Sequence, residues 1–102
     1  MSAKRDACLR AISRWAQESP IVSALILTGS LARADGTADE WSDLDVEVIS
    51  SEPPLLLSSE DWLGAFGSVR ITMRLNGDEH HPWPTRLVIY ASGVRADFTI
   101  AV

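Results

Sequence analysis

The sequence contains a single cysteine, Cys8, so no disulfide can form within the chain. It also lacks a long hydrophobic run: the longest apolar stretches, such as residues 21–27, are far shorter than the roughly 20 residues that cross a bilayer. No continuous apolar segment follows Lys4 and Arg5, so the pattern of a signal peptide is missing. These absences predict a cytoplasmic protein with no membrane partner.

Basic residues are scarce as well, with 9 Lys and Arg against 14 Asp and Glu and a formal net charge of −5. Nucleic-acid affinity comes largely from Lys and Arg that meet phosphates, so nucleic acid is a disfavoured partner. The charge is compatible with a nucleotide bound through a metal ion, because the cation reverses the local sign. An acidic surface would also suit a polycationic small molecule, and solubility alone explains it equally well.

At 102 residues, 46% hydrophobic and 23% charged, the chain predicts one globular domain over residues 1–102. Apolar residues at helical spacing, among them Cys8, Ile12 and Trp15, predict an amphipathic helix over residues 4–18. Ser19-Pro20 ends that helix, and residues 21–27 predict a buried strand. Cys8 is expected in the core.

Alternating polar and apolar residues predict further strands over 43–49, 69–75, 86–91 and 94–102, the last two joined by a tight turn at Ser92-Gly93. Pro53-Pro54 is expected to end the first of these strands, and a short helix before Gly67 should carry Trp62 and Phe66. Residues 35–42 and 76–85 are expected to be loops. The fold class is therefore α+β (α/β), a mixed sheet of about five strands with flanking helices.

One predicted strand carries Asp43, Asp45 and Glu47 on a single face, and the last strand places Asp97 where it can face the same way. Neighbouring like charges on one sheet face repel, so the pattern needs an explanation. A solvated strand face explains it as well as a metal site does. Mg²⁺ prefers hard oxygen ligands such as carboxylates, and two such ions can clamp an in-line displacement.

A second feature, Gly29-Ser30, follows the buried strand of residues 21–27 directly. Glycine permits close backbone approach, and Ser30 with the following amides can donate hydrogen bonds to phosphate oxygens. The dipeptide alone is a weak signal. Its place just before the acidic strand favours a phosphate-binding role.

Two segments, Thr28-Gly29-Ser30 and Ser42-Asp43-Leu44-Asp45-Val46, together resemble the signature of the nucleotidyltransferase (DNA polymerase β-like) superfamily. Residues 62–67 and 95–100 extend the resemblance to the N-terminal part of the aminoglycoside 6-adenylyltransferases, which modify streptomycin. The resemblance implies the nucleotidyltransferase fold and an enzyme that transfers AMP from ATP to an aminoglycoside hydroxyl. The implied partners are ATP and a small-molecule acceptor.

The resemblance also implies roles for individual residues. The metal-binding and catalytic carboxylates would be Asp43, Asp45 and Asp97. They would hold Mg²⁺, as two ions, or Mn²⁺, and Asp97 is also a candidate for removing the proton of the acceptor hydroxyl. Gly29 and Ser30 would contact the triphosphate of ATP.

The chain departs from the family at two points. Many members have Arg directly after Gly-Ser, where this sequence has Leu31, and Arg33 is the candidate substitute in nucleotide binding. The adenylyltransferases also continue into a helical C-terminal region that shapes the acceptor site, and these 102 residues are expected to lack it. Two alternatives therefore stay open: a minimal nucleotidyltransferase that modifies a protein or RNA partner, and a non-catalytic module that binds a nucleotide or a partner.

Several residues have two interpretations. His80-His81 is expected to be loop decoration, because adjacent histidines rarely ligate one metal ion. Glu47 either supports the fold or belongs to the acidic site. Trp41 and Trp83 either pack in the interior, as tryptophan more commonly does, or stack on an adenine or line the mouth of a pocket. Exposed strand edges and four tryptophans also make a homodimer a candidate assembly.

Overall fold

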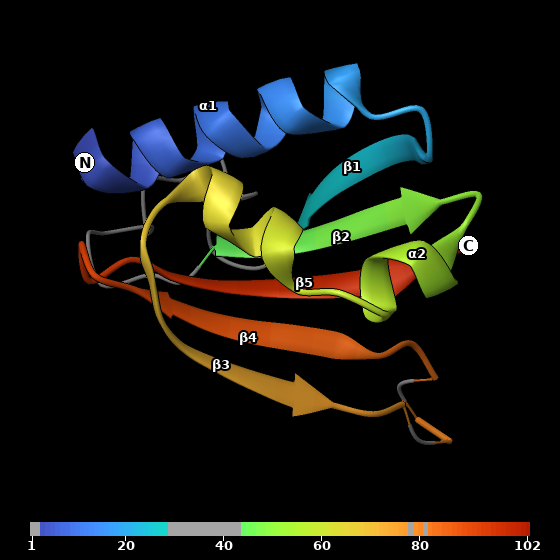
Figure 1. The fold of residues 1–102 in the computed structure, drawn as a ribbon. Helices are drawn as coiled ribbons and strands as arrows, with labels where there is room; N and C mark the ends of the chain where they lie inside the picture. The colour runs from blue at the N-terminus through green and yellow to red at the C-terminus, as the bar shows by residue number, and fades with distance from the viewer. Residues whose placement is uncertain (1–2, 29–43, 78, 81) are drawn as a thin grey trace.

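The computed structural model describes residues 3–28, 44–77, 79–80 and 82–102 and shows one five-stranded sheet with helices on one face (Figure 1). In chain order the elements are α1 (Ala3–Glu18), β1 (Val22–Thr28), β2 (Leu44–Ser50), α2 (Pro53–Leu57), the 3-10 helix η2 (Asp61–Phe66), β3 (Val69–Leu75), β4 (Thr85–Tyr90) and β5 (Arg95–Ala101). The predicted fold class is confirmed, and each predicted strand starts and ends within two residues of its place in the structure.

The strands lie in the order β1-β2-β5-β4-β3. β5 pairs in parallel with β2 on one side and antiparallel with β4 on the other, so the sheet is mixed as expected. The remaining pairs, β1 with β2 and β3 with β4, are antiparallel. This order makes β5, the last strand, the centre of the sheet and the neighbour of β2.

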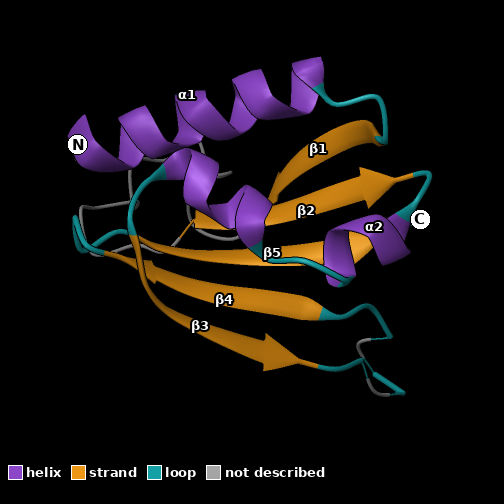
Figure 2. Cartoon of the chain, viewed as in Figure 1, coloured by secondary structure: helices purple, strands orange, loops and turns teal. Residues whose placement is uncertain are grey.

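The two faces of the sheet differ, because side chains alternate along each strand. Leu44, Val46 and Val48 of β2 and Ala96, Phe98 and Ile100 of β5 are buried under the helices. The intervening residues of both strands face the opposite, open side, which none of the described helices covers (Figure 2). The sequence predicted this alternation for both strands, and it is confirmed.

Aromatic side chains join the helices to the sheet. The rings of Trp15 on α1 and Trp62 on η2 stack with their centroids 5.0 Å apart. Trp62 also meets Phe98 of β5 edge to face at 5.4 Å, and its indole N–H donates a hydrogen bond of 2.9 Å to the carbonyl oxygen of Leu56. Because Phe98 is fully buried between them, this cluster fixes the helical layer on the central strand.

The proline pair behaves differently from the sequence prediction. Pro53-Pro54 follows β2 as expected, but it also begins α2. The first N–H groups of a helix have no partner within it, and the fixed φ of proline suits the first turn. Proline at that point therefore starts a helix as readily as it ends a strand.

Two glycines take backbone conformations that other residues adopt rarely. Gly67 ends η2 with φ at +152°, and a Cβ atom there would lie 3.2 Å from Cδ1 of Tyr90. Gly93 has φ at +94° in the turn between β4 and β5, where its N–H donates to the carbonyl oxygen of Tyr90 at 2.9 Å. The predicted turn at Ser92-Gly93 is confirmed.

The apolar side of β3 is exposed. Ile71, Met73 and Leu75 are 47%, 51% and 49% exposed and lie beside Ile89, Leu87 and Thr85 of β4 on the open face. Thr72 and Arg74 of β3 lie beside the buried Val88 and Arg86 of β4 on the helical side, where the guanidinium of Arg74 pairs with the carboxylate of Glu60. Part of the open face is therefore apolar.

The Cys8 thiol is expected to resist alkylation in the folded protein. Burial raises its pKa from 9.0 to about 11, so at pH 8.5 the folded state holds almost no thiolate. Iodoacetamide should therefore modify Cys8 slowly in buffer and rapidly in urea, and equal rates would contradict its place in the core. Because the folded state keeps this proton while the unfolded state loses it, stability should fall as the pH rises from about 9 towards 11.

Candidate active site

Asp45 and Asp97 are direct neighbours on the open face of the sheet. They are Cα partners in the parallel pairing of β2 with β5, and both side chains are partly buried. The sequence predicted that they share a face, and the structure confirms it. Two acids far apart in the sequence are thus brought side by side by the central position of β5.

The apolar residues directly before and after each acid determine on which face of the sheet that acid lies. Leu44 and Val46 flank Asp45, Ala96 and Phe98 flank Asp97, and all four are buried against the helices. A shift of either strand by one residue would move its acid into the core and its apolar residues into solvent. The hydrophobic pattern therefore fixes both carboxylates on the open side.

Like charges on directly opposed residues of neighbouring strands destabilise a sheet. A cation between Asp45 and Asp97 would remove that cost, and carboxylate oxygens are the ligands that Mg²⁺ prefers. The residues present therefore fit a magnesium site. Within the described ranges no group of three or more His, Cys, Asp or Glu side chains could hold a metal ion, and Asp43, the third predicted ligand, lies outside those ranges.

The other residues predicted for nucleotide binding also lie outside the described ranges: Gly29, Ser30 and Arg33, together with Trp41. The strand ends that border this segment are described. β1 ends at Thr28, whose Cα lies opposite that of Asp45, and β2 begins at Leu44. The chain therefore leaves β1 and enters β2 at the same end of the strands, next to Asp45.

A cavity of about 590 Å³ lies on the open face beside the acidic pair. Its lining consists of Glu47, Leu75, Asn76, His80, Pro82, Trp83, Thr85 and Thr99. Trp83, for which packing in the interior was one interpretation, is 41% exposed and lines this cavity. His80 lines it with a side chain that is 82% exposed, and its Nε2 lies 3.8 Å from a carboxylate oxygen of Glu79.

Sequence reasoning missed Thr85 and Thr99, whose hydroxyl oxygens are 3.3 Å apart in this cavity. Thr99 lies two residues after Asp97 on the same strand, and this spacing indicated that its side chain lies on the same face of the sheet. The position of Thr85 follows only from the pairing of β4 with β5, in which Thr85 is the partner of Thr99. Local patterns do not give that pairing.

A smaller cavity of about 260 Å³ includes Asp97 in its lining. Its other walls are mainly apolar and come from β3 and β4, with Arg95 of β5 as the basic side chain: Ile71, Met73, Leu87, Val88, Ile89 and Arg95. The two cavities therefore differ in chemistry. The first carries Glu47 and several other polar side chains, whereas the second is mainly apolar and carries Arg95 together with Asp97.

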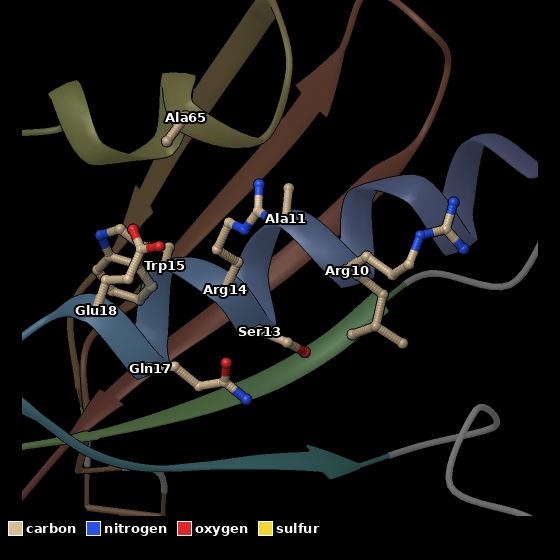
Figure 3. A pocket seen from close by; sticks show the side chains of 9 residues that line it. Arg10, Ala11, Ser13, Arg14, Trp15, Gln17, Glu18 and Ala65 are labelled. Atoms are coloured by element: carbon tan, nitrogen blue, oxygen red, sulfur yellow. The ribbon is translucent and has the colours of Figure 1, made fainter.

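A larger hollow of about 870 Å³ lies along α1, on the helical side of the molecule (Figure 3). Its lining includes Arg10, Arg14, Trp15 and Glu18 of α1, with Ala65 of η2 across from them. Asp45 and Asp97 face the other side of the sheet, so this hollow contributes nothing to the carboxylate site.

A mixed sheet with opposed aspartates on β2 and the central β5, preceded in the sequence by Gly-Ser, is the arrangement of a nucleotidyltransferase domain. Comparison with known families agrees. The family model described as streptomycin adenylyltransferase matches residues 3–102, which is nearly the whole chain. The protein belongs to this family.

One solved structure with a similar fold is the crystal structure of an aminoglycoside 6-adenyltransferase from Bacillus subtilis. It matches 99% of this chain with a TM-score of 0.72 at 14% sequence identity. This chain spans 35% of the length of that protein. No curated protein matches the chain at the level of sequence.

None of the described helices is both long and apolar enough to cross a membrane.

Proposed function

We propose that this chain provides the nucleotide-binding part of an adenylyltransferase that transfers AMP from ATP to a hydroxyl of an aminoglycoside such as streptomycin. The observation that carries the proposal is the opposed pair Asp45 and Asp97 on the open face, in a chain that matches the family over residues 3–102. Two like charges on opposed residues cost stability at this point of the sheet, and a metal-bound triphosphate gives them a role.

Asp45 and Asp97, together with Asp43, are proposed to hold Mg²⁺, as two ions, or Mn²⁺. When bound, the metal supplies positive charge that neutralises the phosphate oxygens and favours the ionised acceptor hydroxyl. The chain positions the reactants: Gly29 and Ser30 donate hydrogen bonds to the triphosphate, and Arg33 adds a positive charge. The sheet keeps the two carboxylates in a fixed relation.

The reaction follows from this arrangement. The acceptor hydroxyl oxygen attacks the α-phosphorus of ATP and forms the new P–O bond, while the bond from that phosphorus to the bridging oxygen breaks. Pyrophosphate leaves with that bonding pair. The hydroxyl proton passes to a carboxylate, for which Asp97 is the proposed acceptor.

The chain spans about a third of the length of the Bacillus subtilis enzyme, so the origin of the acceptor site needs its own proposal. We propose that residues 1–102 form one nucleotidyltransferase domain, and that a further region, a second copy or a partner supplies the rest of the acceptor site. The identity of the acceptor as an aminoglycoside is part of this proposal.

Incubation with ATP labelled at the α-phosphate tests the proposal. With Mg²⁺ and streptomycin we expect labelled AMP on the antibiotic and one pyrophosphate per transfer. Kanamycin, protein and RNA serve as parallel acceptors. Label on protein or RNA alone would favour the minimal-enzyme alternative. Absence of both product and Mg²⁺-dependent ATP binding would contradict the proposed function.

A further inference from the structure

We infer that the cavity containing Glu47 and Trp83 receives a cationic group of the acceptor, an ammonium or a guanidinium. Glu47 and Trp83 are then specificity-determining residues beside the carboxylate pair. The assignment of the ligand as the acceptor rests on the proposed function. The preference of the cavity for a cation rests on its own side chains.

The pairing of the strands places this cavity next to the proposed reaction centre. One row of Cα partners across the sheet contains Asp45, Asp97 and Leu87, and the next row on the same face contains Glu47, Thr99 and Thr85. Neighbouring rows are two residues apart along a strand, which is about 6–7 Å. A ligand held in the cavity can therefore place a hydroxyl at the carboxylate pair.

The cavity also lies on the side from which an acceptor should approach. Thr28, after which the proposed triphosphate residues Gly29 and Ser30 follow in the sequence, lies opposite Asp45. Glu47 lies opposite Ile26, further from that end of the strands. In phosphoryl transfer the attacking and leaving oxygens are roughly in line, so the acceptor and the pyrophosphate occupy opposite sides of the phosphorus.

The chemistry of the walls favours a cation over the alternatives. The Glu47 carboxylate can accept charge-assisted hydrogen bonds, and the exposed Trp83 ring offers a face on which an ammonium or guanidinium can stack. The hydroxyls of Thr85 and Thr99 can bond to sugar hydroxyls. A triphosphate would be repelled by Glu47. The smaller cavity also has a carboxylate, that of Asp97, but the basic Arg95 and the mainly apolar walls make it less suited to a cation.

Streptomycin, which carries guanidinium groups, is the probe. Its dissociation constant is measured by calorimetry with Mg²⁺ and a non-hydrolysable ATP analogue present. We expect E47Q to weaken binding about tenfold or more, since hydrogen bonds to charged groups are the stronger kind. W83L should weaken it roughly threefold to tenfold. The indole N–H signal of Trp83, identified by its loss in W83L, should shift on titration.

Glu79→Gln is the matched control, because it removes the same charge from a neighbouring exposed residue that does not line the cavity. It should change the dissociation constant less than twofold. Melting temperatures establish that each variant is folded. If E47Q misfolds, W83L still tests the cation pocket, because the exposed side chain of Trp83 contributes little to the core.

Three outcomes would overturn the inference: equal weakening by E47Q and E79Q, no shift of the Trp83 signal with streptomycin, or a Trp83 shift caused by the ATP analogue alone. The last would make Trp83 a base-stacking residue. A failure of the proposed function can be distinguished from a failure of this inference. If streptomycin binding depends on Glu47 while Mg²⁺ and ATP do not bind, the cation pocket stands and the nucleotide site is wrong.

Discussion

Asp45→Asn is expected to abolish the stabilisation of this protein by Mg²⁺ and ATP and to lower AMP transfer about a thousandfold. The amide keeps the shape of the side chain but removes the negative charge that holds the metal, and such metal ions contribute several kcal/mol to catalysis. In the unchanged protein, ATP at 100 times its dissociation constant adds about 2.7 kcal/mol. In a domain of this size that raises the melting temperature by roughly 10 °C or more.

The same substitution should leave the metal-free protein equally stable or slightly more stable. Asp45 and Asp97 oppose each other on neighbouring strands, and removing one of two like charges relieves repulsion of about 0.2–1 kcal/mol. A purely structural acid would behave oppositely, and its loss would destabilise the fold. Thermal melting with and without Mg²⁺ and ATP measures both effects, with Glu52→Gln, an exposed acid outside the site, as control. An unchanged ligand shift in D45N would exclude Asp45 from the site.

Phe98→Ala is expected to destabilise the fold by about 3–5 kcal/mol, the usual cost of truncating a fully buried aromatic residue. Phe98 is 0% exposed and contacts the rings of both Trp62 and Phe66. Its loss would leave a cavity between the central strand and η2. Because domains are stable by only about 5–15 kcal/mol, a large part of the variant should be unfolded at moderate urea concentrations.

Urea titration of F98A against L55A measures this effect. Leu55 is an apolar residue of α2 that is 57% exposed, so its truncation should cost less than about 1 kcal/mol. Phe98→Leu, which keeps more of the volume, should fall between the two. Similar midpoints for F98A and L55A would show that the aromatic cluster does not hold the helical layer on the sheet.

Much of the fold was predictable because alternation along a strand is a local property. The pattern around Asp45 specifies both the strand and the side on which the acid lies, since Leu44 and Val46 must be buried. The same argument applies to Asp97 and its neighbours Ala96 and Phe98. The two faces of the acidic strands therefore follow from the sequence alone.

The pairing of Asp45 with Asp97, in contrast, does not follow from a local pattern. It requires β5 to lie between β2 and β4, and no local pattern specifies the order of strands in a sheet. The same limit explains why Thr85 and Thr99 were not predicted as neighbours. Alternation in β3 likewise predicted a strand but not which of its sides the helices would cover, and its apolar side lies on the open face.

Paramagnetic broadening by Mn²⁺ tests the metal-nucleotide site most directly. Mn²⁺ is added far below the protein concentration together with a non-hydrolysable ATP analogue, and the backbone amide signals are followed by NMR. A site between Asp45 and Asp97 should broaden the signals of β2 and β5 around these residues first, and D45N should prevent this. Broadening centred on Glu79 and His80, or an unchanged pattern in D45N, would contradict the carboxylate site.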